Sequence, residues 1–508
     1  MSWHGLSIFG LMLGALALLM LAPAALAASW GDLEVAGVFA VCACLPAIAS
    51  GLFIVATRNA AARTDAMREF AVVVSAMLVA PAFAAAPIAI LAPYLGYAAA
   101  YFEMVSTFTT TGASVFDRPS EIPAAINLWR AMTAWAGGFV ILCAAYALFA
   151  PRNLGGFEVR GDLGRSGAIG RLRGAPEWAG GRGREAAADR IAVACRDIAP
   201  VYGALTLALM VLLIALGEAP LNAAIVAMGA ISTSGVQATE EAPLLASGYV
   251  GEAILLVFLI LAVTRHSYGG GGRKPLRLAR LPGDPEMNLF ALVVGGVTLW
   301  IFLRHWSGAF EVGEDLSSAS AALWGAFVTV LSFATTTGYE SASWDAAQAW
   351  SGLSDATLIL FGLVIIGGGV ATTAGGIKLL RAYALFNHGR REMERLVRPS
   401  SISGTGARKR GLRREGAQIA WVFVMLFLVS MATSMLALSL TGLDFEMSLA
   451  ASIAAFSNAG PVFTAVNDEA SWLTSLNAEG RAVIVAAMAL GRVELLALIA
   501  MINPDNWR

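Results

Sequence analysis

Residues 106–114 read Ser-Thr-Phe-Thr-Thr-Thr-Gly-Ala-Ser, and related phrases occur at three later places in the chain. They are Ile-Ser-Thr-Ser-Gly-Val at 231–236, Leu-Ser-Phe-Ala-Thr-Thr-Thr-Gly-Tyr at 331–339 and Ala-Phe-Ser-Asn-Ala-Gly-Pro at 455–461. Their glycines, Gly112, Gly235, Gly338 and Gly460, are 123, 103 and 122 residues apart. Such internal similarity predicts one structural unit built four times. We call these segments the four glycine phrases.

The composition places the glycine phrases in a membrane protein. Of 508 residues, 58% are hydrophobic and 14% charged, whereas soluble domains average roughly 45–50% and 25%. This excludes a soluble enzyme, a disordered chain and a nucleic-acid binder, and the net charge of −1 adds no bias toward nucleic acid. The cysteines lie in or beside apolar runs without zinc spacing, and we expect buried free thiols: Cys42, Cys44, Cys143 and Cys195.

Ten apolar runs are long enough to cross a bilayer, which takes about 20 helical residues. The predicted spans are 6–28, 34–56, 70–92, 124–149, 192–216, 249–265, 287–306, 353–380, 414–440 and 481–502. Four shorter stretches, 98–109, 220–232, 319–334 and 446–457, suit re-entrant helices. A cleaved signal peptide is the alternative for 6–28, but Met1–Gly5 lacks Lys and Arg and the run exceeds a signal core.

Loop charges predict the orientation. Arginine-rich loops lie at 57–69, 151–190, 265–286 and 381–415, whereas 235–249, 338–352 and 461–480 contain acids and no Lys or Arg. The positive-inside rule makes the arginine-rich loops and both termini cytoplasmic, so all short stretches enter from outside. The outer acids would concentrate cations: Glu240, Glu241, Glu340, Asp345, Asp468 and Glu469. Loop 151–190 could also bind anionic lipid or a regulatory partner.

The expected fold is all-α and integral to the membrane. Two N-terminal helices in 1–56 precede four units of span, short helix, polar hairpin and span. The units cover 57–150, 151–265, 266–385, whose second span is broken, and 386–508.

The glycine phrases suit a cation pathway. Non-helical backbone at membrane depth must be buried in protein or line water, and rings of carbonyls can replace the hydration shell of a cation. Glycine reaches positive φ freely, and the helix C-termini carry partial negative charge. The alternative, that the glycines only cap helices or allow close packing, fits four similar phrases less well. The candidate ligands, largely through backbone carbonyls, are Thr110, Thr111, Gly112, Thr233, Ser234, Gly235, Thr336, Thr337, Gly338, Asn458, Ala459 and Gly460.

A glycine-rich break and a buried arginine are candidates for a gate. Residues 367–376 interrupt a long apolar run with five glycines and two threonines, which predicts an intramembrane gate moved through Lys378 and Arg381, or else a simple kink. Arg492 lies mid-span, where it sets a barrier for cations or pairs with a carboxylate such as Glu103 or Glu494. The candidate gate residues are Gly367, Gly368, Gly369, Gly375, Gly376, Lys378 and Arg492.

Two further intramembrane charges lie in the first unit. Arg130 opens a span from the outside and is either a snorkelling anchor or a functional charge. Glu103 falls in the first short helix, where we expect it to pack against the backbone of the glycine phrase.

These motifs resemble the Trk/Ktr/HKT superfamily of potassium transporters, in its bacterial TrkH-type branch. The similarity is carried by 101–113, by Trp-Arg-Ala-Met-Thr-Ala-Trp-Ala-Gly-Gly at 129–138, by 366–381 and by Gly-Arg-Val-Glu-Leu at 491–495 with Asn-Pro-Asp-Asn-Trp-Arg at 503–508. The resemblance implies K⁺ uptake across the bacterial inner membrane, a homodimer, a cytosolic nucleotide-binding regulatory subunit, and Arg492 beside the pore. It implies no catalysis, no cofactor other than the transported K⁺ and no nucleic-acid partner.

The chain departs from the family pattern at several positions. Ser234-Gly235-Val236 replaces the usual Gly-Gly-Phe, Val462 follows Pro461 where glycine is usual, and alanines stand at 371 and 374. The phrase glycines themselves remain, including Gly112, where serine accompanies Na⁺ preference in the plant branch. The alternatives are a Na⁺/K⁺ non-selective or cation-coupled transporter. A secondary transporter of small solutes would carry more intramembrane acids and inverted repeats, and a membrane enzyme would need clustered His or acidic residues.

Overall fold

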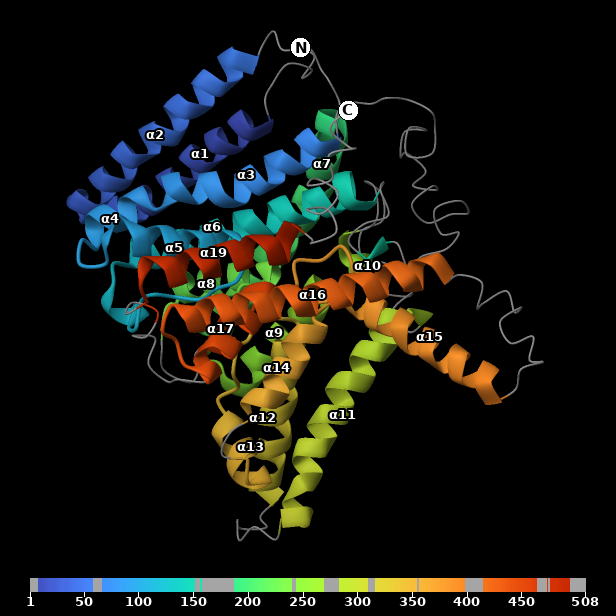
Figure 1. Ribbon diagram of the computed structural model, residues 1–508. Helices are drawn as coiled ribbons and strands as arrows, with labels where there is room; N and C mark the ends of the chain where they lie inside the picture. The colour runs from blue at the N-terminus through green and yellow to red at the C-terminus, as the bar shows by residue number, and fades with distance from the viewer. Residues whose placement is uncertain are drawn as a thin grey trace.

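The structure is a computed structural model that describes residues 8–57, 66–150, 156–157, 187–239, 244–268, 283–308, 316–353, 356–397, 414–463, 473 and 476–493. Every regular element in these ranges is helical (Figure 1). Several predicted features lie outside the described residues: Glu240, Glu241, Asp468, Glu469, Glu494, residues 503–508, and most of loops 57–69 and 151–190. Glu340 and Asp345 are described, and both are exposed.

Two N-terminal helices form a pair on one side of the molecule (Figure 1). They are α1 (Ile8–Ser29) and α2 (Leu33–Thr57). Small residues allow their close approach, and Ser50 Oγ donates to the Gly10 carbonyl at 2.6 Å. Helix α1 buries Leu13 and Met20 completely and also packs against the first unit. It therefore forms part of the helical body, as predicted for a membrane span.

Four units follow, each with a first helix, a helix that leads into a glycine phrase, and a second helix. We call the middle one the pore helix, after its predicted role. Unit 1 contains α3 (Ala66–Ala84), α4 (Ala86–Leu91), α5 (Gly96–Phe108) and α6 (Ala124–Ala144), and unit 2 contains α7 (Ala187–Ala215), α8 (Pro220–Ser232) and α9 (Gly248–Ala262). Unit 3 contains α11 (Pro285–Gly308), α12 (Leu316–Ala334) and α14 (Thr357–Ile366), and unit 4 contains α16 (Arg414–Leu440), α17 (Phe445–Ser457) and α19 (Ala478–Val493).

The four units close into a ring. Within each unit the pore helix packs against both of its neighbours, and the second helix of each unit also packs against the pore helix of the next. These contacts join α6 to α8, α9 to α12, α14 to α17, and α19 back to α5. The four glycine phrases are thereby brought together. The unit boundaries drawn from the sequence stay predictions.

The count of ten spans is not confirmed. Among the described residues, eight helices are long and apolar enough to cross a membrane. Helices α9, α14 and α19 have 15, 10 and 16 described residues, whereas α12, predicted to be short, has 19. The apolar runs in the sequence are longer than α9 and α14 because the buried chain continues past the end of each helix in a non-helical conformation. In α12, conversely, polar residues extend the helix at its N-terminus.

Helix also replaces predicted loop. Residues 381–397 belong to α15 (Leu379–Val397), which leaves the body at one side with Phe386 and Met393 exposed (Figure 1). The arginine content predicted the side of the membrane and gave no information on conformation. The predicted hairpin 338–352 contains α13 (Trp344–Ser351). A four-residue helix, α10 (Arg265–Tyr268), follows unit 2. Helix α6 ends in a π-helical turn, Ala145–Phe149.

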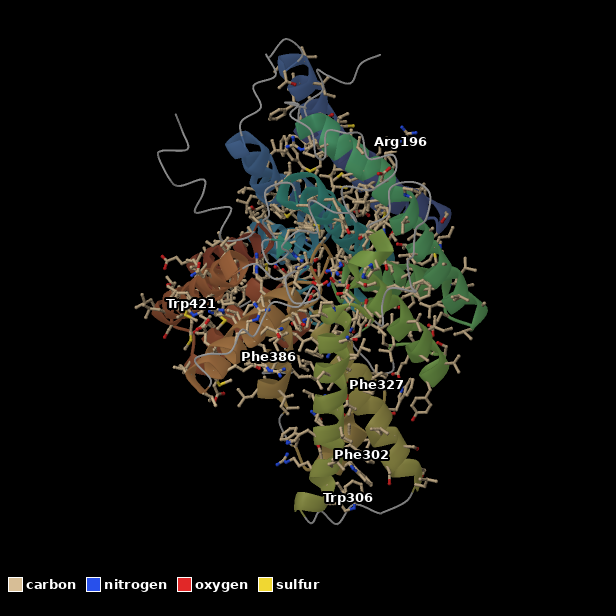
Figure 2. The ribbon with its side chains drawn as sticks, turned by 90° about the vertical axis from the view of Figure 1, so that its right-hand side faces the viewer. Arg196, Phe302, Trp306, Phe327, Phe386 and Trp421 are labelled. Carbon is tan, nitrogen blue, oxygen red and sulfur yellow. The ribbon has the colours of Figure 1, made fainter. Side chains whose placement is uncertain are left out.

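Aromatic side chains lie at the outer surface and at one end of the body. Figure 2 shows Trp421 and Phe386 at the surface, and Phe302 and Trp306 at the end of α11. At that end His305 stacks on Trp350 with ring centroids 3.9 Å apart. Exposed aromatic residues are typical of the interface between membrane and water.

The cysteines are only partly as predicted. All four thiols are free, but Cys44 is exposed and Cys195 half-buried. Cys195 donates to Cys143 across the α6–α7 contact, with the sulfurs 3.3 Å apart.

Candidate functional site

All four pore helices end in the same backbone motif. The residue two places before each phrase glycine has a left-handed conformation, with φ of 53° at Thr110, 53° at Thr233, 60° at Thr336 and 49° at Asn458. In every phrase its N–H donates to the carbonyl three residues earlier, and the next N–H donates to the carbonyl five residues earlier. This is the Schellman closure of a helix C-terminus. Four copies of one motif confirm that the phrases are structural repeats.

Threonine is an unusual residue for this conformation. A β-branched side chain with positive φ is an outlier, and the left-handed region costs about 1–2 kcal/mol for residues other than glycine. Two of the three threonine hydroxyls compensate by binding distant segments: Thr336 Oγ1 accepts from Gly375 N at 2.9 Å, and Thr110 Oγ1 accepts from Arg492. The Thr233 hydroxyl donates instead to the adjacent Ser232 carbonyl at 2.8 Å. The threonine residue type by itself does not predict this role. The available signal was a Thr or Asn two places before every phrase glycine.

The phrase glycines pass around the ring in chain order. A Cβ on Gly112 would meet the Ser234 carbonyl, and one on Gly235 would meet the Thr337 carbonyl. A Cβ on Gly338 would meet the Pro461 ring, and one on Gly460 would meet the backbone of residues 111–113. Each phrase therefore packs against the next one, and the fourth packs against the first. Eleven of the twelve candidate ligand residues are buried in this ring, and Gly112 is half-buried.

The fourth phrase differs from the others in its glycine. Gly112, Gly235 and Gly338 have φ of 77°, 66° and 79°, whereas Gly460 begins a 3₁₀ turn, Gly460–Phe463. Its N–H donates to the Thr111 carbonyl at 2.5 Å. In this conformation one carbonyl proposed for cation binding is thus occupied by a hydrogen bond from the neighbouring phrase.

A buried ion pair between α5 and α6 lies next to the first glycine phrase. Glu103 in α5 lies 2.6 Å from Arg130 Nε in α6, with side-chain exposures of 0% and 2%. The other Glu103 oxygen accepts from Val115 N at 2.8 Å, and Arg130 also donates to Ser114 Oγ at 2.8 Å. Glu103 therefore holds the backbone directly after the first phrase. The snorkelling interpretation of Arg130 is wrong because its side chain lies inside the protein.

The glycine-rich break forms a closed loop, and the simple-kink alternative is wrong. After α14 ends at Ile366 the chain turns away and returns, so that Ile377 N donates to Ile365 O at 2.9 Å and Lys378 N to Ile366 O at 3.0 Å. Positive φ angles at Gly367 (69°) and Gly376 (75°) make these reversals. We call residues 367–378 the glycine loop.

The glycine loop lies against the ends of three pore helices. Thr373 Oγ1 donates to the Ile231 carbonyl of unit 2 at 3.2 Å, and Gly375 N donates to Thr336 Oγ1 of unit 3 at 2.9 Å. A Cβ on Gly375 would meet the carbonyl of Ser457 in unit 4. The loop thus covers the side of the ring where the pore helices end.

Arg492 joins the glycine loop to the remaining pore helix. Its guanidinium donates to the Thr109 carbonyl and to the Thr373 carbonyl, each at 2.5 Å, and to the hydroxyl of Thr110. These acceptors are carbonyl and hydroxyl oxygens. The ion pair proposed between Arg492 and Glu103 is wrong, since Glu103 binds Arg130, and Glu494 lies outside the described residues. A buried cation at the negative end of α5 is electrostatically favourable.

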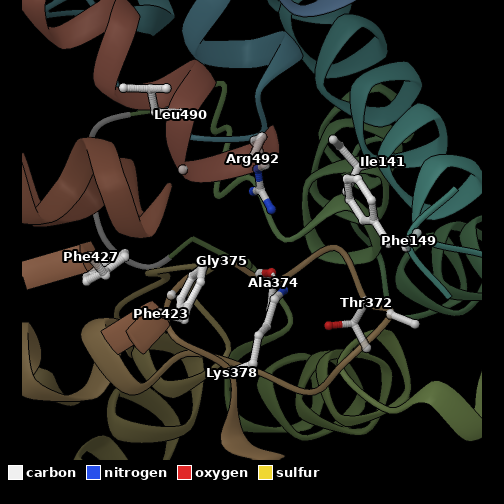
Figure 3. Close-up of a pocket in the computed structure, with 14 residues that line it drawn as sticks. Ile141, Phe149, Thr372, Ala374, Gly375, Lys378, Phe423, Phe427, Leu490 and Arg492 are labelled. Carbon is white, nitrogen blue, oxygen red and sulfur yellow. Dashed lines mark hydrogen bonds between the residues drawn. The ribbon is translucent and has the colours of Figure 1, made fainter. Parts of the chain in front are cut away.

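A small cavity borders the glycine loop and Arg492 (Figure 3). It has a volume of about 40 Å³, room for roughly three water molecules. Its lining includes Ile141 and Phe149 of unit 1, Phe423 and Phe427 of α16, and Lys378. Lys378 Nζ donates to the Ala374 carbonyl. Of the predicted gate residues, Gly375, Gly376, Lys378 and Arg492 meet at this cavity, whereas Gly367, Gly368 and Gly369 belong to the other limb of the loop.

Comparison with known proteins gives a consistent result. Residues 283–506 match the TrkH family, described as a cation transport protein. The Trk system potassium uptake protein TrkH of Escherichia coli K12 is 26% identical over 433 residues, covering 82% of this chain and 80% of that protein. TrkG of the same strain is 25% identical over 414 residues, with 80% and 79% covered.

The fold is also shared with a solved structure. The crystal structure of the potassium transporter TrkH from Vibrio parahaemolyticus superposes with a TM-score of 0.79 at 23% identity, covering 99% of this chain and 98% of that one. This similarity shows the fold. Together, the family match and the relatives show that this chain is similar to TrkH-type membrane transport proteins, and the solved structure shows that it shares their fold.

Proposed function

We propose that this chain takes up K⁺ across the bacterial inner membrane through the ring of four glycine phrases. The observation that carries the proposal is the closed ring itself, in which four copies of one backbone motif meet and each phrase glycine contacts the next phrase. The names of the relatives, which are potassium uptake proteins, support K⁺ as the transported ion.

The chemistry of the ring suits a dehydrated cation. Carbonyl and hydroxyl oxygens of the twelve candidate residues are the available ligands. The C-terminal, partially negative ends of four pore helices converge on the same place. For an ion to bind at the level of Thr111, its carbonyl must exchange the hydrogen bond from Gly460 for the cation. Ion entry and a small adjustment of the fourth phrase are therefore coupled.

The glycine loop and Arg492 act as the gate. Together they hold hydrogen bonds or close backbone contacts with all four pore-helix ends. A conducting path requires the loop to leave these contacts. On this proposal the gate is closed while the loop makes these contacts.

The names of the relatives and the distribution of arginine support the proposed partners and topology. The relatives belong to a "Trk system", which fits a membrane subunit that works with a cytosolic, nucleotide-binding regulatory subunit. A homodimer is part of the same proposal. The arginine-rich loops support a cytoplasmic location of both termini.

The test is Rb⁺ or K⁺ flux into proteoliposomes that contain the purified chain, with and without excess Na⁺. Gly112→Ser is the test variant, because its side chain would meet the Ser234 carbonyl in the ring. Gly37→Ser is the matched control, since a Cβ at Gly37 meets nothing within 4 Å. K⁺-selective flux that Gly112→Ser degrades and Gly37→Ser preserves supports the proposal. Equal Na⁺ and K⁺ flux in the unchanged chain would favour the non-selective alternative.

A further inference from the structure

We propose that Glu286 and Arg265 form a latch that holds the glycine loop from the side opposite the pore helices. The inference concerns positioning residues, and it rests on the proposed function in one respect, namely that the glycine loop is the gate. The claim that the pair restrains the loop depends only on the observed contacts.

Glu286 binds the glycine loop directly. It lies in the first turn of α11 and is 3% exposed, and its Oε1 accepts from the Val370 N–H at 3.2 Å. Its Oε2 lies 2.7 Å from Arg265 Nη1. One carboxylate therefore spans from the loop backbone to a guanidinium, and hydrogen bonds to ionised groups are about twice as strong as neutral ones.

A second carboxylate fixes Arg265 in place. Asp284 Oδ2 lies 2.6 Å from Arg265 Nη2 and 2.6 Å from His266 Nε2, and Asp284 Oδ1 accepts from Glu286 N at 3.1 Å. Burial acts to raise the pKa of the Asp284 carboxyl, but the hydrogen bond from His266 and the charge of Arg265 hold it below its usual value. The Asp284 carboxylate is therefore ionised at neutral pH and can hold Arg265. Tyr146, in the π-helical turn, donates to the Arg265 carbonyl at 3.4 Å.

The latch holds a different limb of the loop from the one that the pore helices hold. Thr373 and Gly375 face the pore helices and Arg492. Val370 faces Glu286, and a Cβ on the adjacent Gly369 would meet the Val263 carbonyl. The loop is thus clamped between the ring and the junction of units 2 and 3. Displacing it requires release on both sides.

The latch is the more accessible of the two restraints. The Arg265 and His266 side chains are 17% and 15% exposed, and they lie in a segment predicted to be cytoplasmic. Arg492 is buried beneath the loop. A signal from the cytoplasm therefore reaches Arg265 before it reaches Arg492. The alternative is a purely structural ion pair that anchors α10 to α11, and it predicts no change in the loop when the pair is weakened.

The experiment measures two properties of the full chain in proteoliposomes: hydrogen–deuterium exchange of peptides covering 367–378, and Rb⁺ flux without added partner. The variant is Glu286→Gln, which keeps an oxygen near Val370 and removes the charge. Arg265 retains Asp284, so no cation is left unpaired. Glu121→Gln is the matched control, because it removes the charge from the exposed pair with Arg118.

We expect exchange within 367–378 to rise roughly tenfold in Glu286→Gln, flux to rise several-fold, and neither to change in Glu121→Gln. Arg265→Lys, which keeps the charge but cannot bind both carboxylates through separate nitrogens, should give a smaller rise in both. Unchanged loop exchange in Glu286→Gln and Arg265→Lys would overturn the latch. Faster exchange with unchanged flux would support the latch and count instead against the loop as the gate.

Discussion

Replacing Arg492 by Gln should increase K⁺ flux in the absence of any regulatory partner. Arg492 donates to the Thr110 carbonyl at 3.3 Å, so a cation bound by that carbonyl would lie about 6 Å from the guanidinium. Two unit charges at this separation repel by about 3 kcal/mol at an effective dielectric constant of 20. Removing the charge therefore favours cation occupancy of the inner ring by roughly a hundredfold. It also removes the bond to Thr373 and loosens the glycine loop.

The assay is Rb⁺ uptake into proteoliposomes, compared with Arg492→Lys. Lysine retains the charge and loses the planar geometry, so it should preserve the barrier while weakening the loop contacts. Flux should rank Arg492→Gln above Arg492→Lys, and Lys above the unchanged chain. Equal flux in Gln and Lys variants would show that the charge sets no barrier. Lower flux in Arg492→Gln, with the protein still folded, would refute the electrostatic reasoning altogether.

Three further substitutions test other parts of the account. Glu103→Leu leaves Arg130 uncompensated in the interior and should lower the free energy of unfolding by about 3–5 kcal/mol, seen as a large drop in Tm in detergent; an unchanged Tm would contradict the buried pair. Thr336→Val removes the acceptor of Gly375 N and should loosen the loop by about 1 kcal/mol, read as faster hydrogen exchange; slower or equal exchange would be inconsistent with it. Gly375→Ala should displace the loop and change gating, whereas Gly362→Ala, where a Cβ meets nothing within 4 Å, should not; identical behaviour of the two would argue against close packing of the loop.

The sequence predicted the pore helices well. The stretch expected at 220–232 has the same bounds as α8, and the one at 446–457 differs from α17 by a single residue. Apolar runs bounded by Ser, Thr and Gly mark both ends of these helices. The ring could also be predicted, because four similar non-helical phrases at membrane depth must be buried in protein or line water. Meeting around one axis is an arrangement that achieves this for all four.

Other features of the site left little local signal. Threonine disfavours positive φ, so the residue type argues against this conformation at Thr110 and Thr336, and only the recurrence of Thr or Asn two places before each phrase glycine indicates a shared role. That conformation is held by contacts with Arg492 and Gly375 from distant parts of the chain. The described acceptors of Arg492 are mainly backbone carbonyls, which every residue possesses, so the residue types could not indicate them. For α15, the many charged residues predicted only the side of the membrane. They gave no indication that Leu379–Val397 forms a helix.

The central claim, that the ring of glycine phrases binds the transported cation, is tested most directly by locating the ion. Anomalous diffraction from crystals grown with Rb⁺ or Tl⁺ would do so. The account predicts a peak enclosed by residues 110–112, 233–235, 336–338 and 458–460, weakened in Gly112→Ser and displaced by excess K⁺ more readily than by Na⁺. Well-resolved density for the ring with a peak only elsewhere, or with none, would contradict it.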